Sequence, residues 1–219
     1  MLDIENNLTY HWHTKRGQVS LLSWSFQYDI LVDVLMEFKR SIGRVDEQAK
    51  KITDGLDKDN ADYIREVAGL TIEQLFGGAF VTCQASITAV VSRIKELHNV
   101  ATESNITINS VPKEKNRLLT FQSPELTAHI TQIQAIDALA NYFKHNDEWP
   151  PGWVNADGRS QATILCLQAL GFVYGNDAIL RKAIELFDSN LIVLANAING
   201  WHETIVAQLK IELINLRLL

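Results

Sequence analysis

Residues 25–56 read SFQYDILVDVLMEFKRSIGRVDEQAKKITDGL, and this stretch sets the fold class. Apolar side chains recur in it alternately four and three residues apart, as they do along the contact face of a coiled coil. They are Leu31, Leu35, Phe38, Ile42, Val45, Ala49, Ile52 and Leu56. The spacing predicts one long helix with a single apolar seam.

A second seam of the same period follows a short polar link, residues 55–60 (GLDKDN). Its members are Phe76, Phe80, Cys83, Ile87, Val90, Ile94, Leu97 and Ala101. Two seams joined by a short link pack most simply on one another as antiparallel helices. The pair Gly77-Gly78 predicts either a close approach of another element or a break in the second helix.

The rest of the sequence predicts shorter helices. Residues 102–122 lose the periodicity and predict a loop. Ser123-Pro124-Glu125 offers a capping hydroxyl, a proline suited to the first helical position and an acid, so it predicts a third helix from there to about His145. Residues 159–173 are apolar nearly all round and predict a central buried helix. A short helix over residues 179–187 and a last helix from about Ser189 complete the chain.

The predicted fold class is therefore all-α. We expect an antiparallel helical bundle of about five to six helices, with two long helices on its N-terminal side. One domain is expected over residues 1–219, in which residues 1–24 form a short extended arm or hairpin and residues 25–219 form the bundle.

Composition narrows the classes of function. The formal net charge of −6 opposes broad adhesion to nucleic acid or anionic lipid. Cys83 and Cys166 both lie in apolar stretches and are expected in the core. The chain begins without a basic, apolar leader, so a cytoplasmic location without a membrane partner is expected. Phosphate-loop, zinc-binding and di-iron sequence motifs are absent, and we expect neither a metal nor another cofactor.

The densest polar cluster falls at the end of the third predicted helix. Asp137, Asn141, Lys144, His145 and Glu148 share one face at helical spacing, opposite a row of apolar residues. Histidine is a general acid or base near neutral pH, and lysine can hold an anion. Asn141 and His145 are the catalytic candidates, Lys144 an anion- or nucleic-acid-binding candidate, and Asp137 and Glu148 members of a polar site.

The hexapeptide Ala140-Asn141-Tyr142-Phe143-Lys144-His145 resembles, in divergent form, the motif of the HEPN superfamily of helical bundles. In that family an arginine, often followed by a polar residue, precedes a histidine with four to six residues between them. The resemblance implies metal-independent RNA cleavage, in which the histidine is a general acid or base and the arginine binds the phosphate across a dimer. Ala140 stands at the arginine position here, so the resemblance implies weak or lost activity.

Three hypotheses follow. The first is a non-enzymatic helical interaction or oligomerisation module of a bacterial cytoplasmic protein, acting as a homodimer or with a protein partner. The second is a HEPN-like RNA-binding protein or weak ribonuclease of a bacterial conflict or stress system. The third is an enzyme or sensor that binds a small molecule between helices, with a carboxylate such as Asp137 turned inward.

Overall fold

The computed structural model describes residues 25–127, 129–154, 157–174 and 179–216 of the chain. The expected arm or hairpin of residues 1–24 lies outside this part. The described residues are almost wholly helical, with one two-stranded sheet, which confirms the all-α class. They hold seven α-helices rather than the predicted five to six, because the segment predicted as a loop contains the short helix α4 (Lys115–Thr120).

The two long N-terminal helices are confirmed as an antiparallel hairpin. Helix α2 spans Ser25–Thr53 and helix α3 spans Lys58–Glu103 without a break at the paired glycines. Gly55 turns the chain with φ +82°, a conformation that glycine adopts without steric cost. Asp57 then caps α3, its carboxylate accepting the N–H of Asn60 at 3.1 Å.

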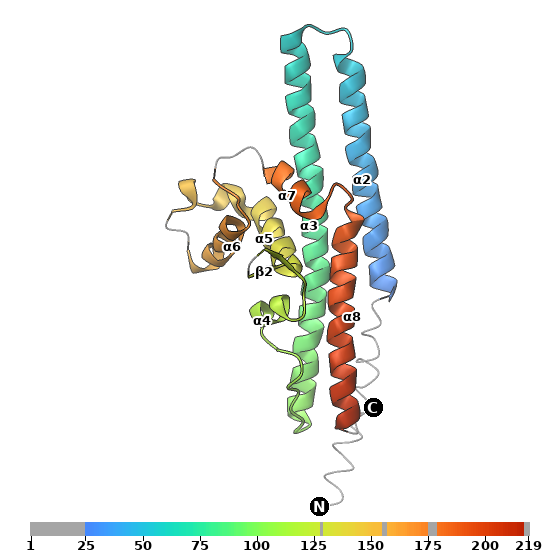
Figure 1. Ribbon diagram of the computed structural model, residues 1–219, viewed down its shortest axis with the longest axis vertical. Helices are drawn as coiled ribbons and strands as arrows, with labels where there is room; N and C mark the ends of the chain where they lie inside the picture. The colour runs from blue at the N-terminus through green and yellow to red at the C-terminus, as the bar shows by residue number, and fades with distance from the viewer. Residues whose placement is uncertain (1–24, 128, 155–156, 175–178, 217–219) are drawn as a thin grey trace, which may run out of the picture.

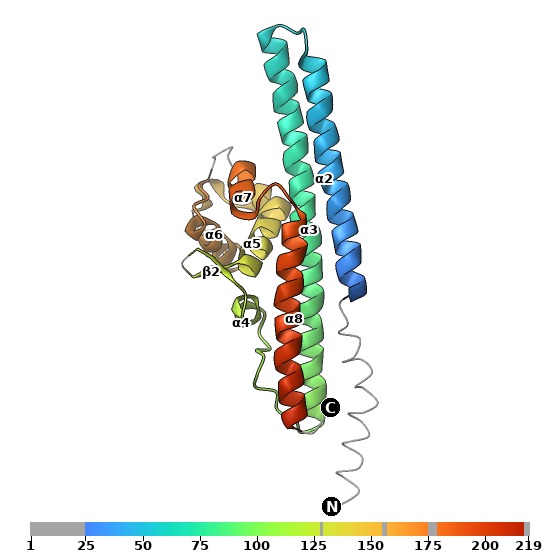
Figure 2. The same cartoon turned by 45° about the vertical axis from the view of Figure 1, so that its right-hand side comes forward.

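Helix α8 (Ile192–Asn215) packs along the half of α3 that is remote from the link (Figures 1 and 2). Its side toward the core is buried and includes Leu191, Leu194, Ile198, Trp201 and Ile205. The ends of α2 and α3 that meet at the link project beyond the other described elements in both views. The α2 seam is buried at Leu31 and Leu35 but exposed at Ile52.

A layer of short elements covers the middle of α3 on the side away from α2. It contains α4, the strands β1 (Glu125–Thr127) and β2 (Ile130–Thr131), helix α5 (Gln132–His145), the 3-10 turns η1 (Asn146–Glu148) and η2 (Pro151–Trp153), helix α6 (Gly158–Ala169) and helix α7 (Ile179–Phe187) (Figure 1). The short helix predicted over residues 179–187 is thereby confirmed.

The predicted start of the third helix is wrong. Residues 125–127 form a strand that pairs antiparallel with β2, and α5 begins only at Gln132. Thr131 caps it instead: its hydroxyl accepts the N–H of Gln134, and the Gln134 side chain accepts the N–H of Thr131 at 3.0 Å. Ser123 still contributes, because its hydroxyl accepts the N–H of Ile133 at 3.4 Å from ten residues upstream.

The predicted central helix is also wrong. Helix α6 is peripheral, with Leu165 57% exposed and one buried side at Ile164 and Leu167. Helix α5 is the buried one: it packs on α3, α6 and α8, and every residue from Ala135 to Ala140 is buried. An apolar composition does not fix which helix lies at the centre, because small residues such as alanine suit an exposed helix equally well.

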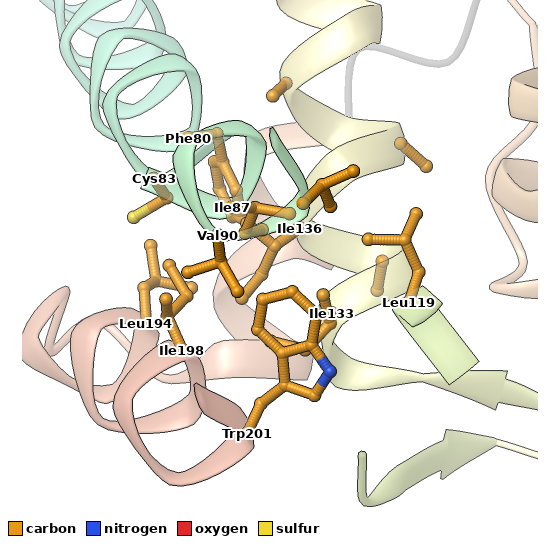
Figure 3. Close-up of a cluster of buried hydrophobic side chains, with 14 of the residues drawn as sticks. Phe80, Cys83, Ile87, Val90, Leu119, Ile133, Ile136, Leu194, Ile198 and Trp201 are labelled. Carbon is orange, nitrogen blue, oxygen red and sulfur yellow. The ribbon is translucent and has the colours of Figure 1, made fainter. Parts of the chain in front are cut away.

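The core lies where α3, α5 and α8 meet, as Figure 3 shows. Phe80, Ile87, Ile136 and Ile198 point into it, and the indole N–H of Trp201 donates to the carbonyl of Leu118 at 3.1 Å. Helix α3 is long and apolar enough to cross a membrane by length and composition. Half of its most apolar 18-residue window is buried inside the fold. Length and apolar composition are shared by membrane-spanning helices and by helices in a protein core, so α3 fits either description by this criterion.

Candidate functional site

A cleft opens at the carboxyl end of α5, where the predicted catalytic residues lie. It has a volume of about 530 Å³ and is lined by Asn141, His145, Glu148, Trp149, Pro150, Asp157, Ser160 and Thr163. The end of α5 and the η1 turn supply one wall, and the first turns of α6 supply the other. The structure thus brings Asn141, His145 and Glu148 to one cavity, as their helical spacing predicts.

His145 and Glu148 interact directly across the helix end. The Nδ1 atom of the imidazole lies 3.3 Å from a carboxylate oxygen of Glu148. A carboxylate on one ring nitrogen fixes the orientation of the imidazole and leaves the other nitrogen for a ligand. The pair is half-exposed on the histidine side and exposed on the glutamate side, so solvent screens its charges.

The opposite wall of the cleft is organised by the start of α6. Asp157 accepts the N–H of Ser160 at 2.8 Å and its hydroxyl at 2.7 Å, as an N-terminal cap does. Sequence reasoning missed Asp157, Ser160 and Thr163, because their approach to His145 depends on how α6 folds back on α5. The capping pattern Asp-x-x-Ser was the one local signal for the position of this wall.

The remaining members of the polar stripe face α3 rather than the cleft. Asp137 is only 8% exposed, and its carboxylate accepts the side-chain amide of Gln84 and the ammonium of Lys115, each at 2.9 Å. The Gln84 amide also donates to the Asn141 side chain at 2.9 Å, and Lys144 donates to the Gln84 carbonyl. The polar stripe is therefore largely an interhelical network, which corrects the expectation of one shared polar site.

Gln84 and Lys115 are the hydrogen-bond partners of Asp137 that sequence reasoning missed. Gln84 sits next to Cys83 within the apolar seam of α3, and a buried amide in such a seam requires hydrogen-bond partners. The position of Gln84 within the apolar seam was therefore the sequence signal for a buried polar contact. Because Asn141 both bonds Gln84 and lines the cleft, it connects the buried network to His145.

The charge of the cleft does not favour phosphate. Its ionisable lining residues in the described part of the chain are His145 and the two acids Glu148 and Asp157. Lys144 is bonded to Gln84 and is not part of the lining. Neither Arg44, which bonds Ser41 on α2, nor Arg93, whose charge acts on His202, lines the cleft in place of the missing arginine.

Comparisons of the chain with protein-family models, with curated proteins and with solved structures gave no significant match. The geometry of the site and of the surface therefore carries the functional argument alone.

Proposed function

We propose that the chain is a non-enzymatic helical interaction module that self-associates through its α2–α3 hairpin. One observation carries the proposal: Tyr63, Val67 and Leu70, the hairpin stripe, are 64%, 43% and 57% exposed on α3. Their spacing of four and three residues puts them on one face of the helix. A row of large apolar side chains in water is typical of a protein contact surface.

The apolar seam of α2 is also incompletely buried in the projecting part of the hairpin. Ile42, Val45 and Ala49 of α2 are only half-buried against α3, although they continue the seam that is fully buried at Leu31 and Leu35. Two helices alone bury little of each other's surface, whereas four helices enclose a core. A second hairpin laid antiparallel on the first would complete a four-helix bundle, so a second copy of this chain fits the surface.

Sedimentation velocity over a range of protein concentrations tests the proposal. We expect wild-type protein to form a dimer and the double variant Tyr63→Gln/Val67→Gln to remain a monomer. Glutamine preserves helix propensity and adds no charge. The matched control is Ile211→Gln/Ile214→Gln, which removes two exposed apolar side chains from α8 and should leave the dimer intact. A monomeric wild type, or a control that dissociates equally, would contradict the role of the hairpin.

A HEPN-like ribonuclease is the second candidate, supported by the cleft that Asn141 and His145 share and by the Glu148 contact that orients the imidazole. The nearby carboxylates and Ala140 lead us to expect weak cleavage at most. The test is cleavage of a mixed RNA without added metal by wild type, His145→Ala and the control His129→Asn. His129 is exposed with φ +76°, which asparagine tolerates. Activity lost only in His145→Ala would support this candidate over a purely structural role.

A further inference from the structure

A second cavity lies at the base of the projecting hairpin, apart from the His145 cleft. It is bounded by α3, the end of α5, the η2 turn and the start of α7, is open to solvent, and has a volume of about 590 Å³. This is within the range of about 300–1,000 Å³ typical of ligand pockets. The side chains that matter for its chemistry are Glu66, Leu70, Glu73, Tyr142, Trp153 and Tyr174.

Three aromatic rings line this cavity at steep angles to one another. The Trp153 ring centroid lies 6.4 Å from that of Tyr142, with 77° between the planes, and 6.1 Å from that of Tyr174, with 73° between the planes. Because the rings are nearly perpendicular to one another, their faces point in different directions. The negative face of an aromatic ring attracts a cation within about 6 Å, and tryptophan does so most strongly.

The backbone holds Trp153 in place through a strained turn. Pro151 and Gly152 occupy the middle of the turn, Gly152 with φ +72°, and the N–H of Trp153 donates to the carbonyl of Pro150 at 3.0 Å. Trp153 itself has φ +56°, in the left-handed region that costs a non-glycine residue about 1–2 kcal/mol. Strain of this kind is concentrated at ligand-binding sites, where the surrounding packing maintains it.

The charge on the cavity wall has one sign. Among its described lining residues, the charged ones are the two carboxylates Glu66 and Glu73, one helical turn to either side of Leu70 and Gly69. Burial raises the pKa of Tyr142, a hydrogen bond with the Asn146 side chain acts in the opposite direction, and the negative charge of Glu73 raises the pKa again. The cations of α7, Arg181 and Lys182, line a different pocket and both pair with Glu185.

We propose that this cavity binds an organic cation, an ammonium or guanidinium group that carries apolar substituents. The rings of Tyr142, Trp153 and Tyr174 contact the substituents and attract the charge, and Glu66 and Glu73 supply the counter-charge at the rim. The cation has two sources, a free quaternary ammonium compound or a methylated lysine or arginine side chain of a protein. The site borders the hairpin contact, because Leu70 belongs to both, but it does not include Tyr63 or Val67 and does not require self-association.

Calorimetric titration of the full chain with choline tests the charge requirement directly. The control ligand is the neutral alcohol in which carbon replaces the choline nitrogen, because it has the same shape without the charge. We expect choline to bind at least several-fold more tightly than the alcohol. Equal affinity would overturn the proposal, because it would show a merely apolar cavity. A second arm uses the acetylated amides of trimethyllysine and dimethylarginine, and the ligand that binds most tightly identifies the source.

A conservative variant separates the rings from the fold. Tyr174→Leu retains an apolar side chain at a half-exposed position and removes the ring, so we expect choline affinity to fall about 3- to 30-fold, the size of a cation–π contact. Tyr63→Leu, outside the cavity, should leave affinity unchanged. Unaltered binding in Tyr174→Leu, or no binding of any of the three cations to wild type, would overturn the proposal. The Tyr63→Gln/Val67→Gln protein should bind choline normally, so failure of the hairpin contact is distinguishable from failure of this site.

Discussion

The side-chain amide of Gln84 on α3 donates a hydrogen bond of 2.9 Å to the carboxylate of Asp137 on α5, and both side chains are buried. The contact joins residues 53 positions apart in the sequence. It fixes the rotation of α5 on α3, because a buried amide that loses its partner carries the full cost of desolvation. The rotation of α5 in turn places Asn141 and His145 at the cleft.

We expect Asp137→Ala to lower the free energy of unfolding by about 1–3 kcal/mol, because it removes the carboxylate acceptor of the buried Gln84 amide, which keeps only its bonds to Asn141 and to the backbone carbonyl of residue 137. Adding Gln84→Leu should restore part of this loss, since the amide that lost its carboxylate acceptor is then removed as well. Urea unfolding followed by circular dichroism measures both effects. Glu148→Ala, at an exposed position beyond the end of α5, should change stability by less than about 0.5 kcal/mol. Strictly additive losses in the double variant would contradict the pairing.

Gly77 gives the second prediction, because the side chain of Phe143 on α5 packs directly against it. A Cβ at this position would lie 2.7 Å from Cδ1 and 2.8 Å from Cγ of Phe143, and that ring stacks on Phe80. We expect Gly77→Ala to destabilise by about 1–3 kcal/mol despite its better helix propensity. Gly43→Ala in α2 meets no atom within 4 Å and should stabilise by up to about 1 kcal/mol. Thermal unfolding compares the two, and Phe143→Leu should relieve the clash if the ring is its cause.

The long helices could be predicted because the spacing of apolar residues along the sequence is enough to indicate them. Every member of the α3 seam from Phe76 to Ala101 is buried, as the four-three period requires. The same period in α2 could not reveal that Ile52 would stay exposed, because a seam does not encode how many helices cover it. Of the two alternatives for Gly77-Gly78, the structure shows the close approach, with Phe143 at one glycine and Phe38 at the other.

The errors arise where tertiary contacts override a local signal. Ser123 does cap a helix, but one that begins ten residues further on after the chain has folded back through β1 and β2. The weaker-looking Thr131 and Gln134 pair marked the true start. In the candidate site, His145 and Glu148 are neighbours at helical spacing and could be paired from sequence. Asp137 does not line the cleft with them, because it is hydrogen-bonded to the buried side chain of Gln84 on α3, 53 residues away in sequence.

Glu212 provides a prediction about the segment between α3 and α4. Its carboxylate accepts the N–H of Asn109 at 2.7 Å, the N–H of Ser110 at 3.0 Å and the hydroxyl of Ser110 at 2.5 Å. Partial burial raises its pKa, but these hydrogen bonds outweigh burial and lower it below the ordinary value. The carboxylate should therefore stabilise the fold above its unfolded pKa, and this contribution should be lost as the pH falls.

We expect Glu212→Gln to speed amide hydrogen exchange at Asn109 and Ser110 at neutral pH, because a neutral acceptor binds the two N–H groups less strongly. The exchange of amides in the middle of α3 should stay as in wild type. Glu203→Gln, on the same helix, is the matched control, since Glu203 instead accepts from Asn199 within α8. Equal exchange at Asn109 in wild type and Glu212→Gln would show that the carboxylate does not hold this segment.

His202, buried on α8, should make the protein sensitive to mild acid. Its pKa is lowered to about 4, mainly by burial and also by the charge of Arg93, while the charge of Glu203 acts in the opposite direction. The unfolded chain has the ordinary histidine pKa of about 6.5, so it binds a proton between about pH 6.5 and 4 that the folded chain does not bind. Stability should therefore fall as the pH drops through this window, by about 2 kcal/mol between pH 7 and 5.

Urea unfolding at a series of pH values measures this loss in wild type and in His202→Gln, which cannot titrate there. Because the carboxylates contribute equally to both proteins, the difference between their two pH profiles isolates the histidine. His129→Asn removes an exposed histidine and should reproduce the wild-type profile. Parallel profiles for wild type and His202→Gln would show that His202 takes up its proton as readily in the folded chain as in the unfolded one, contrary to its burial between α3 and α8.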